Sequence, residues 1–262
     1  MSGPLGVCHL GPTPYREGLA LQEALVRRCA ERARSGGAAG GAGEDAATAD
    51  VSDWLLFPDH PPVLTVGRGG SEASLRVSRE ALAARGVELF EVSRGGDMTW
   101  HGPGQLVGYP IVDLSRCGRD LHAFLRALED VLIEALAGWG LAADRVPGRT
   151  GVWAGEEKVA SLGIAVRGWV SYHGFALNVE PDLTFFDLIH PCGLRGVRMT
   201  SLRERLGPGA PSLAAARREV AALLARRLGY EGTRDVPAEA IRRLARGIQE
   251  VPAAPSAAHH AA

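Results

Sequence analysis

The clearest pattern along the chain is a stripe of apolar residues with helical spacing from about Asp120 to Trp139. It predicts a long amphipathic helix that packs against a sheet, and Gly140 suits its C-terminal end. The stripe consists of Leu121, Phe124, Leu125, Leu128, Val131, Leu132, Ala135, Leu136 and Trp139. Weaker patterns and caps predict further helices over residues 16–34, Ser78–Gly86, Ser212–Leu228 and Pro237–Gln249.

Apolar runs of strand length predict the β-structure. The two longest are Lys158–Val166 and Trp169–Val179, and because only Arg167-Gly168 separates them, they predict a tight hairpin. Leu106–Leu114 is another strand candidate, and Pro110 predicts an edge or bulge because proline cannot donate to a ladder. Shorter strands are predicted at Asp53–Phe57, Val63–Gly67 and Glu88–Ser93.

The order of these elements predicts an α/β (α+β) fold with a mixed β-sheet. Regular βαβ alternation, which would indicate a doubly wound sheet, is missing. We expect a single domain over residues 1–250. Within it, residues 35–50 are dominated by Gly and Ala and predict a flexible surface insertion. The Pro/Ala-rich residues 251–262 predict a disordered tail.

Composition excludes several function classes. A formal net charge of −1 over 262 residues argues against nucleic acid or an anionic membrane as the main partner. The apolar runs are far shorter than a membrane span, and the N-terminus does not read as a secretory signal. The four cysteines match neither a disulfide framework nor a zinc site. We therefore expect a cytoplasmic protein.

Cys192 stands apart from the other cysteines. It follows His190-Pro191 and precedes Gly193, so its backbone is restricted on one side and free on the other. A lone thiol with a basic partner is what nucleophilic acyl transfer requires. We interpret the remaining cysteines, Cys8, Cys29 and Cys117, as small buried apolar residues, which is the usual role of a free cysteine.

A glycine-rich segment, Arg94–Gln105, is the second feature with chemical potential. Its glycines bend the backbone and let it approach a ligand closely. It is neither a P-loop nor a dinucleotide-binding fingerprint. Composition alone is equally compatible with a simple turn. Arg94 as a fixed cation, Thr99 as a hydrogen-bonding group and Trp100 as an apolar wall favour a binding site.

Two further residues allow more than one interpretation. Lys158 begins an apolar strand, and the pattern alone favours a solvated lysine over one that points into a cleft. His173 lies in a strand, and a structural role is favoured over a functional one. Metal binding is a poor interpretation, because His190 and Cys192 lack a second ligand pair. A serine hydrolase is equally poor, since no G-x-S-x-G motif occurs.

Four segments together resemble the lipoyl(octanoyl) transferase family. They are Arg94–Gln105, Lys158–Ile164, His173–Asn178 and Pro191–Gly193, in that order within roughly residues 50–205. The resemblance implies a biotin/lipoate protein ligase-like fold, in which helices flank a mixed sheet. It also implies that residues 1–250 form one octanoyltransferase catalytic domain.

The resemblance implies a specific reaction. An octanoyl group would pass from octanoyl-acyl carrier protein to a lysine of a lipoyl domain, in 2-oxoacid dehydrogenase E2 subunits or glycine cleavage H protein. This is the first step of endogenous protein lipoylation. No cofactor, ATP or metal is implied, because the donor thioester is already activated.

The resemblance also implies residue roles. Cys192 would carry the acyl group as a thioester, and Lys158 would favour its thiolate and later act as a general base. The implied substrate-binding residues are Arg94, Gly95, Gly96, Asp97, Met98, Thr99, Trp100, His101, Ser161, Leu162, Gly163, Gly174, Phe175 and Ala176. Of these, Trp100, Leu162 and Phe175 suit the walls of an eight-carbon pocket.

Several alternatives stay open. His190, where the family commonly has another polar residue, could assist or replace Lys158. An ATP-dependent lipoate ligase shares the fold, and a non-enzymatic carrier-binding relative is a third hypothesis, although Lys158 and Cys192 argue against it. Four arginines after Cys192 could bind an acidic carrier protein or simply form a solvated face. They are Arg195, Arg198, Arg203 and Arg205.

Overall fold

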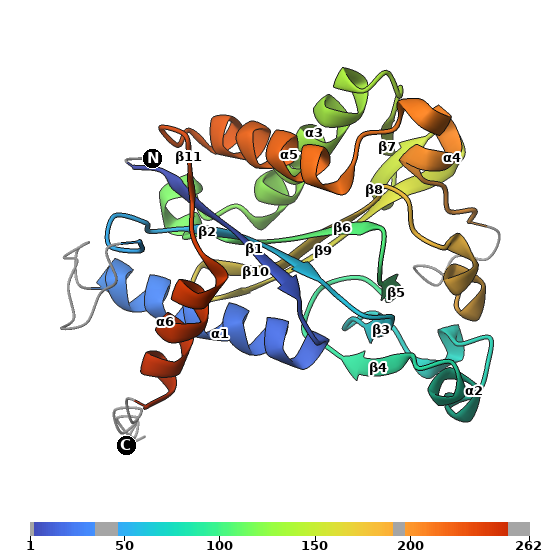
Figure 1. The fold of residues 1–262 in the computed structure, drawn as a ribbon, viewed down its shortest axis with the longest axis horizontal. Helices are drawn as coiled ribbons and strands as arrows, with labels where there is room; N and C mark the ends of the chain where they lie inside the picture. The colour runs from blue at the N-terminus through green and yellow to red at the C-terminus, as the bar shows by residue number, and fades with distance from the viewer. Residues whose placement is uncertain (1–2, 35–46, 191–196, 251–262) are drawn as a thin grey trace, which may run out of the picture.

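A computed structural model describes residues 3–34, 47–190 and 197–250. Within them, an eight-stranded mixed sheet runs through the molecule (Figure 1). Its strands, in spatial order, are β11 (Thr233–Asp235), β1 (Leu5–Pro12), β2 (Trp54–Asp59), β6 (Gln105–Ile111), β10 (Val170–Asn178), β9 (Glu157–Arg167), β8 (Arg149–Ala154) and β7 (Asp144–Val146). The β11–β1 and β1–β2 pairs are parallel, and the others are antiparallel. The predicted mixed sheet is confirmed.

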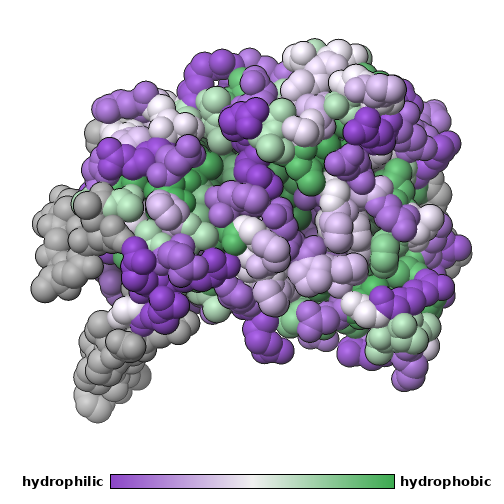
Figure 2. Space-filling model, viewed as in Figure 1, coloured by the Kyte–Doolittle hydropathy of each residue, from purple (hydrophilic) through white to green (hydrophobic). Residues whose placement is uncertain are grey.

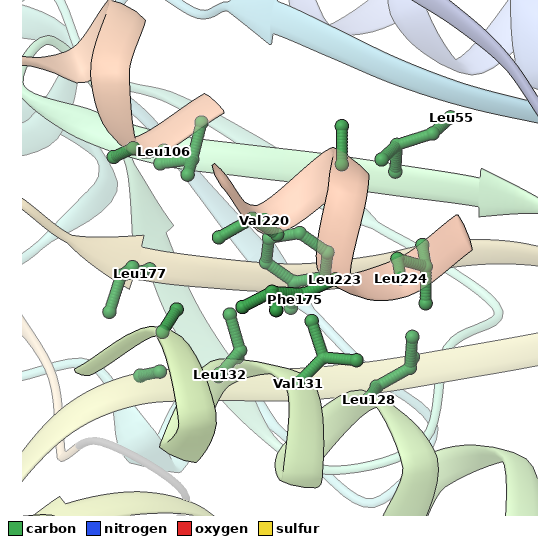
Figure 3. Close-up of a cluster of buried hydrophobic side chains, with 14 of the residues drawn as sticks. Leu55, Leu106, Leu128, Val131, Leu132, Phe175, Leu177, Val220, Leu223 and Leu224 are labelled. Atoms are coloured by element: carbon green, nitrogen blue, oxygen red, sulfur yellow. The ribbon is translucent and has the colours of Figure 1, made fainter. Parts of the chain in front are cut away.

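Two layers of helices cover the sheet. Helices α3 (Leu121–Gly138) and α5 (Leu213–Leu228) lie on one face, and α1 (Tyr15–Arg34) and α6 (Ala238–Glu250) lie on the other (Figure 1). In the first layer, Phe175 of β10 lies between Val131 of α3 and Leu223 of α5 (Figure 3). Burying a side chain of this kind is worth about 1.5–3 kcal/mol, so these contacts fix the central strands.

A second, three-stranded sheet lies beside the first. It consists of β4 (Glu88–Glu91), β3 (Val63–Val66) and β5 (Met98–His101). It has its own apolar core, in which Leu64 and Trp100 pack with Phe186 from the 3-10 helix η3 (Leu183–Leu188). The remaining short helices are η1 (Glu72–Ser74), α2 (Arg79–Ala84), η2 (Leu114–Cys117), α4 (Leu202–Leu206) and η5 (Gly207–Gly209).

The predicted helices are confirmed, and local capping explains their limits. The side chains of Ser78, Asp120 and Ser212 each accept a hydrogen bond from a backbone N–H in the first turn of α2, α3 and α5. Gly229 ends α5 with φ of 75°, a conformation that favours glycine.

Two expectations about local structure are corrected. Strand β6 lies inside the sheet, where Pro110 pairs with Leu55 of β2, so the edge position predicted from Pro110 is wrong. The ladder between β6 and β10 ends at Gly108, before the proline. The β9–β10 turn residues are Gly168 and Trp169, both with positive φ, rather than Arg167-Gly168.

Residues 35–46 of the predicted insertion at 35–50 lie outside the described residues, as does the predicted tail at 251–262. Thr48, at the described end of the insertion, is fully buried, and the flexibility of the insertion stays a prediction. Among the helices described, none combines the length and the apolar character needed to cross a membrane. The face shown in Figure 2 is mostly hydrophilic, with hydrophobic residues in separate patches.

Candidate active site

The glycine-rich segment after β4 forms one wall of a cavity. The buried Arg94 guanidinium holds it against β3, because Nη2 donates to Thr65 O at 2.7 Å and to Thr65 Oγ1 at 2.8 Å. Gly95 N–H donates to Ile164 O at 3.0 Å, which ties the same segment to β9. On its outer side, Ser74 Oγ donates to Asp97 Oδ2 at 2.7 Å.

Strands β9 and β10 form the opposite wall. Their register places Gly163 opposite Gly174 and Ser161 opposite Ala176. A Cβ on Gly163 would lie 2.8 Å from Gly95 O, and one on Gly174 would lie 2.6 Å from Pro110 Cδ. Glycine at 163 therefore lets the two walls approach each other, and glycine at 174 lets β10 lie close to β6.

The space between these walls is about 470 Å³, including its open mouth. It is lined by Tyr15, Arg94, Gly96, Asp97, Met98, Thr99, His101, Tyr109, Ser161, Leu162, Gly163, His173, Gly174, Phe175 and Ala176. The structure thus brings together most of the residues named from the glycine-rich, β9 and β10 segments. Their role in substrate binding stays a prediction.

Two of the named residues do not line the cavity, and a third has a different role from the one expected. Gly95 faces β9 through its backbone hydrogen bond. The Trp100 ring lies away in the small sheet's core, 5.0 Å from the Phe185 ring and 5.6 Å from the Phe186 ring, so it is not a pocket wall. Phe175 borders the cavity, but its ring belongs to the helix-covered core (Figure 3).

Sequence reasoning missed two aromatic residues of the cavity. Tyr15 reaches it from the start of α1, and Tyr109 reaches it from β6. His60 Nε2 lies 2.8 Å from Tyr109 OH, and the Tyr15 ring stacks on the His101 ring at 6.4 Å. The alternation of β6 could have indicated Tyr109, whereas no local signal marks Tyr15.

A chain of buried hydrogen bonds begins at His101. Its Nδ1 lies 2.8 Å from Gln105 Oε1, Gln105 Nε2 donates to Asn178 Oδ1 at 3.0 Å, and Asn178 Nδ2 donates to Thr200 O at 2.9 Å. With this amide orientation, Gln105 Oε1 must accept, so His101 Nδ1 carries the proton. Burial, followed by nearby His60, lowers the pKa of His101 to about 3.

His173 also lines the cavity, although the pattern favoured a purely structural role. Its φ is +58°, unusual for a residue other than glycine, and its N–H donates to the Gln22 side chain at 2.7 Å. Burial, followed by the positive charges of Arg94 and Arg68, lowers its pKa to about 3. The imidazoles of the cavity are therefore neutral at physiological pH.

Lys158 is only 2% exposed, so the solvated lysine favoured by the pattern is wrong. Its Nζ lies 5.6 Å from the centroid of the Trp153 ring, and it is not among the described residues that line the cavity. The backbone N–H of Lys158 donates to Arg198 O at 2.9 Å, and the backbone carbonyl of Lys158 accepts from Thr200 N–H at 3.0 Å. The chain that follows residue 196 is thus paired with Lys158.

Cys192 lies outside the described residues, as do all of residues 191–196. The chain is anchored on both sides of them. His190 N–H donates to Ser74 O at 2.7 Å, and Ser74 in turn bonds to Asp97 of the cavity wall. On the other side, Met199 forms a bridge with Lys158. The anchors therefore lie at the cavity wall and at Lys158.

The other three thiols fit their interpretation as packing residues. Cys8 and Cys29 are buried, and Cys117 is partly buried against the helix-covered core. Burial raises the pKa of Cys8 to about 12, and it also raises the pKa of Cys29 and Cys117. These thiols remain protonated, which makes them poor nucleophiles.

The arginines considered for carrier binding are paired with glutamates. Arg198 pairs with Glu157 and Glu204, Arg205 with Glu157, and Arg203 with Glu180. Arg195 lies outside the described residues. No group of three potential metal ligands occurs among the residues described.

Comparison with known proteins connects these features. A family model described as the lipoyl protein ligase A/B catalytic domain matches residues 14–224. An octanoyltransferase of Geobacter sp. strain M21 is 48% identical over 198 residues, covering 76% of this chain and 85% of that protein. An octanoyltransferase of Rubrobacter xylanophilus is 46% identical over 225 residues, covering 85% of this chain and 93% of that protein.

Solved structures share the fold. A lipoate-protein ligase A bound with ATP superposes with a TM-score of 0.69 at 20% identity, over 95% of each chain. A bi-partite lipoate protein ligase from Thermoplasma acidophilum gives 0.67 at 17% identity, over 95% of this chain and 93% of that one. The expected biotin/lipoate protein ligase-like fold is confirmed.

Proposed function

The chain belongs to the lipoyl protein ligase A/B catalytic-domain family and, within it, to the octanoyltransferases, and from this premise we propose its reaction. It transfers an octanoyl group from octanoyl-acyl carrier protein to a lysine of a lipoyl domain, through a thioester on Cys192. This is the first step of protein lipoylation. The free thiols of Cys8, Cys29 and Cys117 support a cytoplasmic enzyme.

One observation supports the proposal above all. The chain leading into residues 191–196 is anchored at the wall of a narrow cavity, and the chain leaving them is paired with a buried lysine. The described chain on either side of residues 191–196 therefore approaches both a cavity and a buried lysine. A binding space for the acyl group and a basic partner for the thiol are what covalent acyl transfer needs.

In the first half-reaction, the Lys158 ammonium stabilises the Cys192 thiolate, since a nearby cation lowers the pKa of a thiol. The thiolate attacks the octanoyl carbonyl, a bond forms between Sγ and that carbon, and the carrier's carbon–sulfur bond breaks. The carrier thiolate leaves and takes up a proton from the Lys158 ammonium, which leaves Lys158 neutral for the second half-reaction. No external activation is required, because a thioester is exchanged for a thioester.

In the second half-reaction, the acceptor lysine amine attacks the acyl carbon on Cys192. The amide bond forms, the Cys192 thiolate leaves, and neutral Lys158 accepts the proton released by the amine. The lysine that held a thiolate in the first step thus serves as a base in the second.

The cavity suits an apolar chain. Arg94 bonds to β3 and His101 bonds to Gln105, whereas Asp97 Oδ1 and His173 Nδ1 are buried without a hydrogen-bond partner. The two imidazoles of the lining are neutral, and glycine backbone makes up part of the wall. Burial gains about 0.8 kcal/mol per methylene, so binding grows with chain length until the cavity is full.

Intact-mass measurement after incubation with octanoyl-acyl carrier protein tests the proposal. We expect an added mass of about 126 Da, located on Cys192, because the transfer chemistry leaves an acyl group on the nucleophile. Cys192→Ala should abolish the adduct, whereas Cys117→Ala, which changes the partly buried thiol of η2, should retain it.

An ATP-dependent ligase would behave differently. Cys192→Ala would then keep near wild-type octanoylation of a lipoyl domain, and activity would require ATP with free octanoate. That pair of results would contradict the proposal. An adduct that forms but never reaches a lipoyl domain would instead indicate a carrier-binding protein without turnover.

A further inference from the structure

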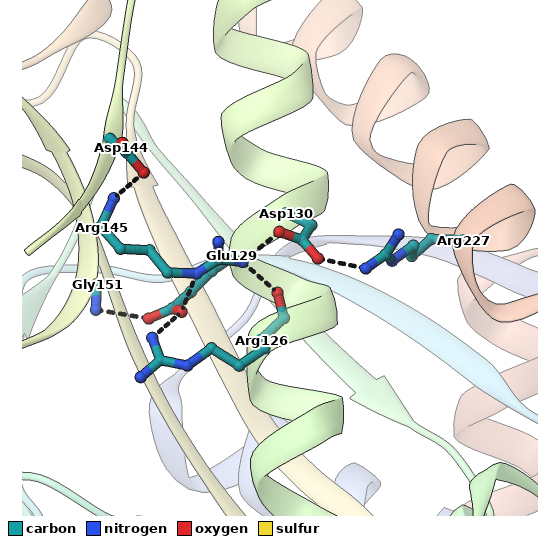
Figure 4. Close-up of polar contacts among 7 residues, drawn as sticks. All are labelled: Arg126, Glu129, Asp130, Asp144, Arg145, Gly151 and Arg227. Atoms are coloured by element: carbon teal, nitrogen blue, oxygen red, sulfur yellow. Dashed lines mark hydrogen bonds and ion pairs between the residues drawn. The ribbon is translucent and has the colours of Figure 1, made fainter. Parts of the chain in front are cut away.

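Glu129 is a fully buried carboxylate on α3, outside the residues that line the cavity. It accepts hydrogen bonds from Arg126 Nη1 at 2.6 Å and from Arg145 Nε at 2.8 Å (Figure 4). Its other oxygen, Oε1, accepts from the backbone N–H of Gly151 on β8 at 3.0 Å. A buried carboxylate is costly unless it is paired, so this network holds α3, β7 and β8 in one arrangement.

Gly151 connects this network to Lys158. A Cβ on Gly151 would lie 3.1 Å from Lys158 Nζ and closer still to Cε, so the Gly151 backbone is itself in contact with the lysine side chain. Gly151 has φ of +130°, which side chains rarely allow. Two residues further along β8, the Trp153 ring also contacts Nζ. Strand β8 therefore forms a wall that fixes where the ammonium can lie.

We propose that Glu129 is a positioning residue for Lys158. By holding the Gly151 N–H, it sets the position of the β8 backbone, and the β8 backbone sets the position of the Lys158 ammonium. The inference rests on the proposed function, in which that ammonium acts on the Cys192 thiol. Glu129 does not line the cavity, so we expect it to act through β8 and not by contact with the substrate.

The other charged groups on the neighbouring elements are already paired. Glu157 and Glu204 share Arg198, and Arg145 also pairs with Asp130. The guanidinium of Arg149 lies 5.6 Å from the Trp153 ring centroid, and Asp144 accepts a hydrogen bond from Arg145 N–H at 2.7 Å. Among the described groups, Glu129 is the carboxylate that bonds directly to the β8 backbone at the lysine contact.

The rate of Cys192 alkylation by iodoacetamide, measured from pH 5 to 10 on the full-length protein, tests the proposal. Glu129→Ala should move the midpoint of this profile to higher pH. The reaction at neutral pH should then slow by about tenfold for every pH unit that the midpoint moves, because less of the thiol is ionised. Glu129→Gln should stay near wild type, because its amide oxygen can still accept from Gly151.

Glu134→Ala is the matched control. Glu134 lies on the same helix, is exposed and pairs with Arg226, so its loss should leave the profile unchanged. Both Glu129 variants lose the charge that holds two arginines, so both should lose stability. If Glu129 had only a structural role, both variants would displace the midpoint of the alkylation profile by the same amount. If Glu129 positions Lys158, only Glu129→Ala displaces it.

Two results would overturn the inference: an unchanged midpoint in Glu129→Ala, or an equal displacement of the midpoint in Glu129→Gln. If Glu129→Ala does not fold, Gly151→Ala replaces it. That variant keeps the carboxylate and places a methyl group against Lys158, and an unchanged midpoint would contradict the inference. If Lys158→Ala leaves the wild-type profile unchanged, the proposed function itself fails.

Discussion

The imidazoles of His60, His101 and His173 stay uncharged at neutral pH, because burial lowers their pKa values to about 4, 3 and 3. In the unfolded chain they titrate near 6.5. Unfolding below about pH 6.5 therefore takes up protons that the folded protein does not bind. Their contribution to stability is complete above that pH and is lost as the pH falls through 4 towards 3.

This linkage predicts the behaviour of a single variant. His101→Gln should reduce the proton uptake on unfolding by about one between pH 4.5 and 6, which flattens the pH dependence of unfolding free energy by about 1.4 kcal/mol per pH unit. Urea unfolding across this range measures the slope. His122→Gln, at an exposed position of α3, should keep the wild-type slope. Equal slopes in both variants would contradict neutral burial of His101.

At the scale of elements, the approach of the glycine-rich segment to the β9–β10 hairpin decides the width of the cavity. Gly95 N–H bonds to Ile164 O, and a Cβ on Gly163 would meet Gly95 O at 2.8 Å. The two walls cannot move apart without losing that bond, and β9 cannot carry a side chain at position 163.

Gly163→Ala should therefore cost about 1–3 kcal/mol of stability through overpacking and should lower kcat/KM for octanoyl transfer. Thermal unfolding and steady-state kinetics measure the two effects. Gly138→Ala is the matched control, because a Cβ there meets nothing within 4 Å. It should keep wild-type activity and gain up to about 1 kcal/mol. Full activity in Gly163→Ala would show that the cavity is wider than this contact implies.

Some elements could be predicted from sequence because their signals are local. The stripe of α3 and the caps Asp120 and Ser212 identify helices without reference to the rest of the chain. Strands depend on distant partners. β5 lies within a glycine-rich segment whose composition indicates a turn, and the three exposed residues of β11 carry no alternation. The edge position predicted from Pro110 is wrong because the sequence does not reveal that the hydrogen-bond ladder between β6 and β10 ends at Gly108.

At the scale of the whole molecule, the cavity lies where the two sheets meet, between β5 and the β9–β10 hairpin. The motifs identified the loops of this junction but not Tyr15, which comes from a helix about 80 residues before the glycine-rich segment. The burial of Lys158 was equally unpredictable, because residues 198–200 pair with it only after the chain has returned across the molecule.

Charge at this scale bears on the two roles left open for the arginines that follow Cys192. Those described pair with Glu157, Glu180 and Glu204, which offsets much of their positive charge. Exposed pairs of this kind are worth less than about 1 kcal/mol each, so they can exchange partners when an acidic surface approaches.

The most direct test of the covalent mechanism is a single-turnover chase. Octanoyl-enzyme would be isolated from the donor and mixed with a lipoyl domain in the absence of ATP, and both species would be followed by mass. We predict that octanoyl leaves Cys192 and appears on the acceptor lysine at least as fast as the steady-state rate. An octanoyl-enzyme that forms but does not deliver its acyl group, or delivers it only when ATP is added, would contradict the mechanism.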